Sequence, residues 1–473
     1  MASGHPWVAR GLPPATSAPW EAARSAGRLT CPWPRHPHRA PTARALRKDP
    51  PLTTFTTDAS AALDGPSWLQ SRRATAAAAF AGADLPSTDE EIWRYSRIDD
   101  LSLDDFAPAA AAGTDLMLPA GARALVEAVR DRAATVVVAN GRVVAADVDE
   151  ALVAKGVRIG AAGDGQADLV GAAMGDAPDA FVLLHDAFVA DVVVVDVPAG
   201  VVLPGPVVIV HVTAGDGVAA FPHLVVRAGD DSEVSVLEVQ ASDDSRVLVV
   251  PVTEIVVGRA ARVGHVTAQQ LGMAAWQLGV QVSRVGAEAS LRSASIGFGG
   301  EYARLRTDCR MVGRGATGEL DAIYFGEGDQ TLDFRTFQDH IAPDCTSNLL
   351  FKGAGGGRSR SVYTGMIRVG KQARGTNAFQ TNRNVKLSDG AWAESVPNLV
   401  IENNDVRCSH ASAVGPVDEE QRFYLESRGV PTEDAERLIV TGFFDEVLTR
   451  LPVPGVLPLL RSTVAAKFER KDA

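Results

Sequence analysis

The sequence has few cysteines, few aromatic residues and a deficit of positive charge. Its four cysteines are Cys31, Cys309, Cys345 and Cys408, and no two of them form a C-x-x-C pair. Widely spaced cysteines in a large chain predict reduced thiols, as in a cytoplasmic protein, rather than a disulfide framework. The net charge of −12 argues against nucleic-acid binding, because such binding depends on neutralising phosphates with Lys and Arg.

Motifs of several enzyme and membrane protein classes are also missing. No apolar run reaches the roughly 18–20 residues that span a bilayer, so we expect no membrane partner. The glycine cluster at 353–357 lacks the lysine that ends a phosphate-binding P-loop, and neither H-E-x-x-H nor G-x-S-x-G occurs. We therefore expect a chain that is neither an ATPase nor another enzyme.

Residues 1–51 differ in composition from the rest. They contain ten prolines, many arginines, two acidic residues and no hydrophobic period, which predicts a disordered Pro/Arg-rich extension. Such a segment also resembles an organelle transit peptide, although its prolines oppose the amphipathic helix of those peptides. A third interpretation is that the segment is translated from upstream of the true start.

The next part, residues 52–133, reads as a small N-terminal helical domain. An alanine-rich helix is predicted over 68–81, with Ser67 as its cap and Gly82 as its end. A second helix is predicted over 121–132. Between them, Trp93 and Tyr95 are expected to pack this domain onto the rest of the chain.

From residue 134 to 416 short β-type runs follow one another, separated by turn residues. They include 135–139, 181–185, 192–197 and 206–212. Corner glycines recur at 27- to 29-residue intervals, and a further one comes 57 residues later: Gly229, Gly258, Gly286, Gly313 and Gly370. This period favours stacked β turns, with a large sandwich and chance glycines as the alternative.

Residues 417–473 read as a C-terminal helical domain. Helices are predicted over 418–427, from Thr432, and from about Val456. The second helix has an apolar stripe at helical spacing: Leu438, Ile439, Phe443 and Val447. Such stripes usually pack against the protein's own body, and the functional interpretation is a groove for a partner.

The segment 398–430 holds the most suggestive chemistry. Cys408 and His410 are two residues apart on an extended stretch, so their side chains are expected on the same side. A thiol and an imidazole could share a soft metal or a sulfur species. A buried thiol beside a hydrogen-bonded histidine is the common alternative, because a structural metal site usually needs four ligands.

This C-terminal segment resembles the signature of the SufB/SufD family of iron–sulfur cluster assembly scaffolds. The matching segments are 402–410, 418–420, 423–425, 427–429 and 442–444, with 339–354, 358–369 and 379–391 upstream and the E-E-I-W-R-Y motif at 90–95. The resemblance implies a mainly β fold with a right-handed parallel β-helix core, flanked by small N-terminal and C-terminal helical domains. In such a fold, His340, Cys345, Thr381 and His410 could converge.

The resemblance also implies partners and a cargo. It implies a SufB-like paralogue, a SufC-like ATPase that docks on the C-terminal helices, and a transient iron–sulfur cluster shared with the partner. SufB-like chains have a cysteine where Thr381 stands and a glutamate where Ala411 stands, so the sequence is more similar to the SufD branch. His410 is then the first candidate cluster ligand and Cys408 the second. Cys345 and His340 are weaker candidates, and His340 is expected to order the loop before Pro343.

Two other classes remain as alternatives. One is a purely architectural β-helix partner with no cluster ligand of its own. The other is an extracellular polysaccharide-degrading β-helix enzyme, which would need a secretion signal and clustered acidic residues. The sequence determines neither the cluster type, nor the stoichiometry, nor whether a flavin binds.

Overall fold

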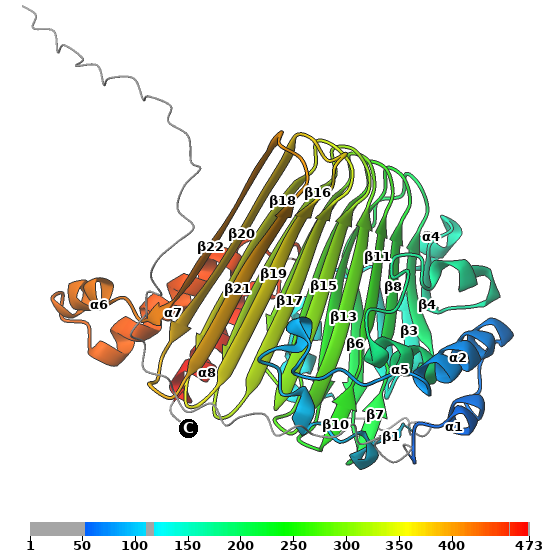
Figure 1. Ribbon diagram of the computed structural model, residues 1–473, viewed down its shortest axis with the longest axis horizontal. Helices are drawn as coiled ribbons and strands as arrows, with labels where there is room; N and C mark the ends of the chain where they lie inside the picture. The colour runs from blue at the N-terminus through cyan, green and yellow to red at the C-terminus, as the bar shows by residue number, and fades with distance from the viewer. Residues whose placement is uncertain (1–52, 110–117, 454, 472–473) are drawn as a thin grey trace, which may run out of the picture. The chain divides into compact units, whose positions relative to one another are not determined.

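The computed structural model describes residues 53–109, 118–453 and 455–471. The predicted disordered extension at 1–51 lies outside these residues. Within them, two long parallel sheets run side by side, and the chain alternates between them (Figure 1). This arrangement confirms the predicted mainly β, parallel β-helical fold with helices near both ends.

One sheet, called sheet A here, has a path of nine strands, and three short strands join it at its side. The path contains β4 (Arg158–Ala161), β5 (Val192–Val197), β8 (His223–Ala228), β11 (Val252–Val257), β13 (Trp276–Val285), β15 (Tyr302–Met311), β17 (Thr331–His340), β19 (Arg360–Val369) and β21 (Trp392–Ile401). The short strands are β1 (Ala107–Pro108), β7 (Val218–Ala220) and β10 (Val247–Val249).

The other sheet, sheet B, contains β3 (Arg142–Val148), β2 (Ala134–Ala139), β6 (Val207–Thr213), β9 (Glu233–Ser242), β12 (Arg262–Gln270), β14 (Ser290–Gly297), β16 (Thr317–Gly326), β18 (Thr346–Gly355), β20 (Thr376–Lys386) and β22 (Val406–Pro416). Neighbouring strands of a sheet are one turn of the β-helix apart. Val252 pairs with His223 of the preceding turn and with Val280 of the following turn, and the spacing of these partners in the sequence matches the glycine period.

The corner glycines explain that period. A Cβ at Gly229 would lie 2.6 Å from the backbone nitrogen of Ala199, and a Cβ at Gly313 would lie 1.9 Å from that of Ala287. Since both contacts are with the backbone of the preceding turn, only glycine lets the turns stack at normal strand spacing there. Gly370 is looser, because its nearest neighbour would be a carbonyl oxygen at 3.4 Å.

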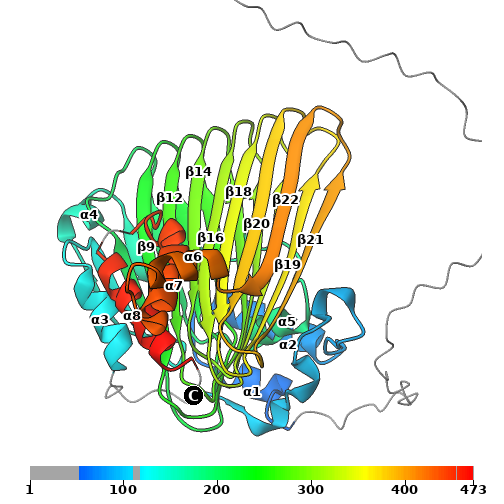
Figure 2. The same cartoon turned by 90° about the vertical axis from the view of Figure 1, so that its left-hand side faces the viewer.

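Side chains alternate between the interior of the β-helix and its outer faces. Val207 and Ile209 of β6 belong to the inner hydrophobic cluster, whereas Val208 and Val210 belong to a cluster on the outside of sheet B. Runs that read as continuously apolar are therefore buried on both sides. Figure 2 shows the helices α3 (Ala120–Ala128), α7 (Thr432–Leu448) and α8 (Leu457–Glu469) on the outside of sheet B.

The outer face of sheet A is covered by the N-terminal helices. These are α1 (Thr57–Ala61), α2 (Ser67–Phe80) and α5 (Ala180–Phe188), with the 3₁₀ turns η1 (Glu91–Trp93), η2 (Ile98–Asp100), η3 (Leu103–Asp105) and η4 (Asp164–Leu169) nearby. The remaining helices are α4 (Glu150–Ala154) and α6 (Glu419–Glu426). No helix in the described part of the chain is both long and apolar enough to cross a membrane.

Several local predictions need correction. Residues 181–185 form part of the helix α5 rather than a strand, because Asp179 caps it and a short apolar run has no period that separates helix from strand. Helix α2 begins at Ser67 itself, after Pro66, so Ser67 is not its cap. Helix α7 likewise begins at Thr432, after Pro431, so Thr432 is not its cap. Helix α3 ends at Ala128 and is shorter than predicted.

Of the two predicted anchors of the N-terminal domain, only Trp93 is buried. The Arg304 guanidinium lies over the Trp93 ring, 3.8 Å from its centroid. The neighbouring Arg335 guanidinium donates to the Arg94 carbonyl oxygen. Tyr95 is 45% exposed and has a φ of 68°. Its ring nevertheless packs against Trp392 of β21, with the ring centroids 6.0 Å apart, so both predicted anchors contact sheet A and Trp93 is the buried one.

Candidate functional site: the C-terminal edge of the β-helix

The last turn of the β-helix consists of β21 and β22. Among the described strands, β21 pairs only with β19 and β22 pairs only with β20 (Figures 1 and 2). Each strand therefore presents one unpaired edge of backbone N–H and C=O groups. Such an edge is a ready template for another chain.

Strand register places Cys408 and His410 on the inward side of this turn. Cys408 pairs with Ala378 and His410 with Gln380, and both of these neighbours are buried in the interior. In a parallel ladder, paired residues point the same way. The two candidate ligands therefore share one side of the strand, as their spacing predicts.

The two residues differ in accessibility. The Cys408 side chain is half-buried and packs on an apolar cluster formed by Ile367, Val369, Ala373 and Ala378. Burial raises the pKa of this thiol, so it is protonated near neutral pH and needs a metal to displace its proton. His410 is exposed, because no further described turn stacks over it.

Two side chains do not make a closed metal site. Among the described residues, only one group of three or more His, Cys, Asp or Glu side chains is close enough to hold an ion, and it does not include Cys408 or His410. Protein ligands to iron–sulfur clusters are typically four. The edge can therefore supply part of a ligand set and leaves the remainder to another source.

The weaker candidates do not converge with His410. His340 lies inside the β-helix in β17, where its Nε2 is 2.9 Å from the Ser347 hydroxyl, and this contact spans the corner that contains Pro343. Burial lowers the pKa of His340 to about 4. Cys345 is buried at a corner, and its thiol donates to the carbonyl oxygens of Gly313 and Ala342.

The two positions that distinguish the branches of the family are direct neighbours. Thr381 of β20 pairs with Ala411 of β22, on the outer side of sheet B. Ala411 is not among the residues with positive φ, so its backbone conformation suits an alanine. A cysteine and a glutamate at these positions would lie side by side, and this chain has neither.

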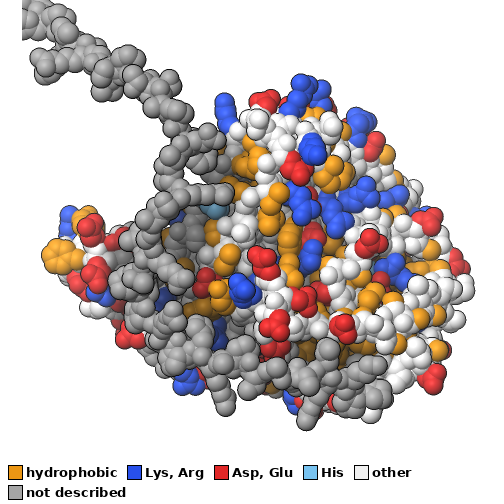
Figure 3. All heavy atoms as spheres, in the orientation of Figure 1, with side chains coloured by type: hydrophobic (Ala, Val, Ile, Leu, Met, Phe, Trp, Pro, Cys, Tyr) orange, Lys and Arg blue, Asp and Glu red, His pale blue; other side chains and the backbone are white. Residues whose placement is uncertain are grey.

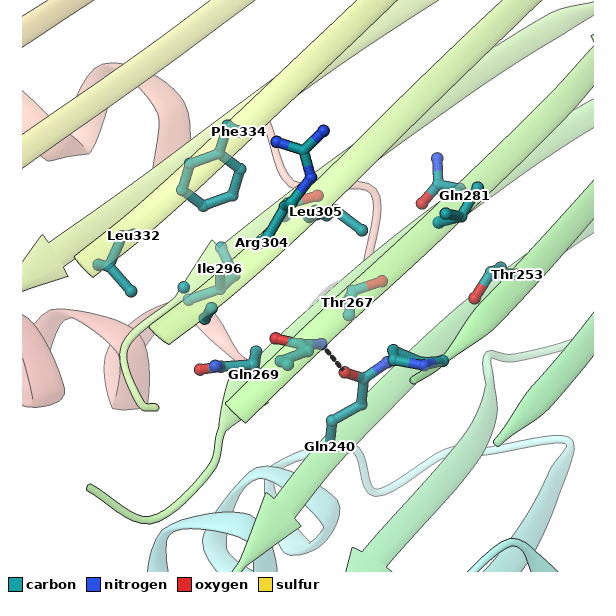
Figure 4. A pocket seen from close by; sticks show the side chains of 16 residues that line it. Gln240, Thr253, Thr267, Gln269, Gln281, Ile296, Arg304, Leu305, Leu332 and Phe334 are labelled. Carbon is teal, nitrogen blue, oxygen red and sulfur yellow. Dashed lines mark hydrogen bonds between the residues drawn. The ribbon is translucent and has the colours of Figure 1, made fainter. Parts of the chain in front are cut away.

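The interior of the β-helix is polar in its middle turns, which the sequence reading missed. Gln277 donates to Gln240 over 2.6 Å, and a cavity of about 30 Å³ lies among these and other inward side chains (Figure 4). This volume suits about one ordered water. Nearby, Glu238 accepts from Gln240 and contacts His265, and these bonds lower the pKa of Glu238 to about 2.

The predicted docking stripe on α7 divides into buried and exposed parts. Val447 is fully buried against the β-helix, whereas Leu438 is 54% exposed. Ile439, Phe443 and Leu438 line a groove of about 530 Å³ between α7, α6 and the ends of β20 and β22. Beside it, α6 exposes Phe423 and Tyr424, and Figure 3 shows hydrophobic side chains at that end of the molecule.

A comparison with known families matches residues 211–443 to the SufBD core domain of SUF-system iron–sulfur cluster assembly. An iron–sulfur cluster assembly SufBD family protein of Mycobacterium tuberculosis is 37% identical over 280 residues, which are 58% of this chain and 68% of the relative. The iron–sulfur cluster assembly protein SufD of Bacillus subtilis is 29% identical over 292 residues, covering 60% of this chain and 66% of the relative. SufD of Escherichia coli is 32% identical over 169 residues, covering 36% of this chain and 40% of the relative. The chain belongs to the SufB/SufD family of the SUF iron–sulfur cluster assembly system.

Proposed function

We propose that this chain is a SufD-like, non-catalytic subunit of a scaffold on which iron–sulfur clusters are assembled. It pairs with a SufB-like paralogue and docks a SufC-like ATPase. The nascent cluster is the cargo, held between the two β-helical subunits. Thr381 and Ala411 support the SufD branch, because neither side chain can supply the thiolate or carboxylate of a SufB-like chain.

The observation that carries the proposal is the C-terminal edge described above. Both of its strands have an unpaired side among the described residues, and Val400, Ile401 and Val414 are exposed there. Exposed apolar side chains beside open backbone groups favour strand addition by a second β-helix. A paralogue with the same turn geometry would continue both ladders.

His410 is the ligand that this chain contributes. It is exposed at the edge, and neutral imidazole is a good ligand for iron. Cys408 is the second candidate, because its thiol is half-buried and its pKa is raised. The partner would supply the remaining ligands.

The ATPase is proposed to bind the groove at α6 and α7. The groove is apolar, and Leu438, Ile439 and Phe443 line it. A helix of the partner could lay its apolar face there, as in other helix-in-groove complexes. Asp418, Glu419 and Glu420 at the start of α6 would face basic side chains of that partner.

The first experiment is anaerobic purification of the tagged chain from its own cell extract, followed by identification of the bound proteins. We expect a paralogous β-helical protein and an ABC-type ATPase in near-stoichiometric amounts. The variant Ile401→Asp should lose the paralogue and keep the ATPase, because a charge at the edge opposes pairing. A chain recovered alone at low salt would contradict the proposal.

The second experiment separates a ligand role from an architectural one. His410→Ala should keep both partners and assemble less cluster, measured by iron and acid-labile sulfide per complex. Arg407→Ala is the matched control, since Arg407 is exposed on the same strand but on its other side. If His410→Ala and Cys408→Ser together leave cluster assembly unchanged, the chain is an architectural partner only.

A further inference from the structure

A second group of metal-binding side chains lies far from the C-terminal edge. His185 and Asp186 are on α5, and His223 begins β8 of sheet A, which α5 covers (Figure 1). Six strand steps of sheet A separate β8 from β21, which is about 29 Å at normal strand spacing. One ligand atom from each of the three residues lies within 4.8 Å of the other two.

The hydrogen bonds of the two histidines fix which ring nitrogens carry protons. Nδ1 of His185 is 2.7 Å from the Val250 carbonyl oxygen, which can only accept, so Nδ1 donates. Nε2 of His223 is 3.2 Å from Oε1 of Glu254. The Glu254 carboxylate already accepts from three backbone N–H groups, those of Gly171, Ala173 and Met174, and these bonds favour its ionised form.

These assignments leave two lone pairs facing each other. In the neutral rings, Nε2 of His185 and Nδ1 of His223 carry no proton, and they are 3.0 Å apart. Both rings are buried, so water does not separate them. Two lone pairs at this distance repel, and a cation between them removes the conflict.

A buried oxygen beside the rings points to the same cation. Oδ2 of Asp186 pairs with Arg72 over 2.8 Å, but its Oδ1 is buried and has no hydrogen-bond partner. A buried carboxylate oxygen without a partner costs free energy unless a cation or donor satisfies it. The unsatisfied groups thus comprise two imidazole nitrogens and one carboxylate oxygen.

We propose that His185, His223 and Asp186 bind one divalent first-row transition-metal ion, through Nε2, Nδ1 and Oδ1 respectively. Two imidazoles and one carboxylate form a common ligand set for such ions. At metal–nitrogen distances of about 2.1 Å, nitrogens 3.0 Å apart correspond to an angle of about 90° at the metal. This angle favours six-coordinate geometry over the tetrahedral geometry of structural zinc.

The surroundings of the ligands fit a metal site. Metal-binding histidines usually donate their other ring N–H to a carboxylate or a backbone carbonyl, and here both kinds of partner are present. Glu254 is held in turn by the 171–174 loop. The ion would therefore fasten α5 and this loop to sheet A. Arg72, which pairs with Asp186, is 26% exposed at the side chain.

The test uses the full-length chain with the edge ligands removed by Cys408→Ser and His410→Ala. This double variant is incubated with Co²⁺ under reducing conditions and desalted, and retained cobalt is measured by mass spectrometry and visible absorption. We expect one Co²⁺ per chain, the weak bands of a six-coordinate ion, and a melting temperature raised by Co²⁺ and lowered by a chelator. Adding His223→Gln should remove the retained cobalt and the change in melting temperature.

Two further variants keep the result interpretable. Asp186→Asn preserves side-chain volume and should weaken cobalt retention at least tenfold, which covers the case that His223→Gln does not fold. His340→Gln changes a buried histidine outside the cluster and should retain one Co²⁺. Retention below 0.1 equivalent in the edge-ligand variant, or equal retention with and without His223→Gln, would overturn the proposal. The His185–His223 contact would then be a shared proton in a buried ion pair with Glu254.

Discussion

Replacing Gly313 with alanine should separate two turns of the β-helix. The new Cβ would lie 1.9 Å from the Ala287 nitrogen and 2.5 Å from its Cα. A normal contact needs about 3.2 Å or more, so the turns would have to move apart by about 1.3 Å, against a strand spacing of about 4.8 Å. The backbone of Gly313 does not have positive φ, so this clash rather than strain in φ is the cause.

The energetic cost follows from the hydrogen bonds between these two turns. The two turns are joined here at three carbonyl oxygens, over 2.8 to 3.1 Å: Val285 O accepts from both Val312 N and Gly313 N, Arg314 O accepts from Glu288 N, and Ala289 O accepts from Thr317 N. A separation of this size takes each donor and acceptor beyond hydrogen-bonding distance. At about 1 kcal/mol for each of the three acceptors, the loss of these bonds destabilises this part by about 3 kcal/mol.

Gly370→Ala is the matched control, because its Cβ would meet only the His340 carbonyl oxygen at 3.4 Å. Hydrogen exchange followed by mass spectrometry measures the local stability of each segment in both variants. A local measurement is needed because a long stacked structure need not unfold in one step. Amides at 285–290 and 312–317 should exchange about 100-fold faster in Gly313→Ala and nearly normally in Gly370→Ala. Equal effects of the two substitutions would refute the argument that backbone contact selects glycine at these corners.

Three other predictions test buried and exposed groups. Burial holds the pKa of His340 at about 4, below its unfolded value near 6.5, so the unfolded state binds more protons between these values. Stability should therefore fall as pH decreases from about 6.5 to 4, by at most about 3 kcal/mol, and urea titrations of His340→Gln should lack this component. Asp333→Asn should lower the free energy of unfolding by about 3–5 kcal/mol, because Arg304 and Arg335 would stay buried without their carboxylate. Limited proteolysis of this variant should then cleave near Trp93. Leu438→Asp should leave the melting temperature unchanged and weaken ATPase binding, because the Leu438 side chain is exposed. Val447→Asp should prevent folding, because Val447 is fully buried. Equal melting temperatures of the two variants would contradict this distinction.

The sequence was informative wherever a backbone constraint repeats. Glycine is required at corners such as Gly229 and Gly313 because the preceding turn touches them, so the period is visible without a structure. Strand parity likewise placed Cys408 and His410 on one side. The predicted strand at 181–185 failed because its burial comes from packing against α2, which no local pattern reports.

The buried polar clusters could not be found from spacing alone. The contact between His185 and His223 joins residues far apart in the sequence, and it depends on how α5 crosses sheet A. One signal was available once the period was known. His211 pairs with Gln240, and Gln240 pairs with Gln269, each one turn further along, so polar residues one period apart were candidates for a stacked polar ladder.

The two ends of the β-helix differ in strand direction, and this difference bears on how β-helices could stack on each other. At the C-terminal end β21 and β22 continue the parallel ladders, whereas at the other end β3 and β4 run antiparallel to their neighbours. Among the described strands, an open edge that continues the parallel ladders is therefore present at the C-terminal end only. If the proposed pairing uses the C-terminal edges of both β-helices, it leaves no parallel edge open for a third, and this topology would oppose fibre growth, the usual hazard of open sheet edges.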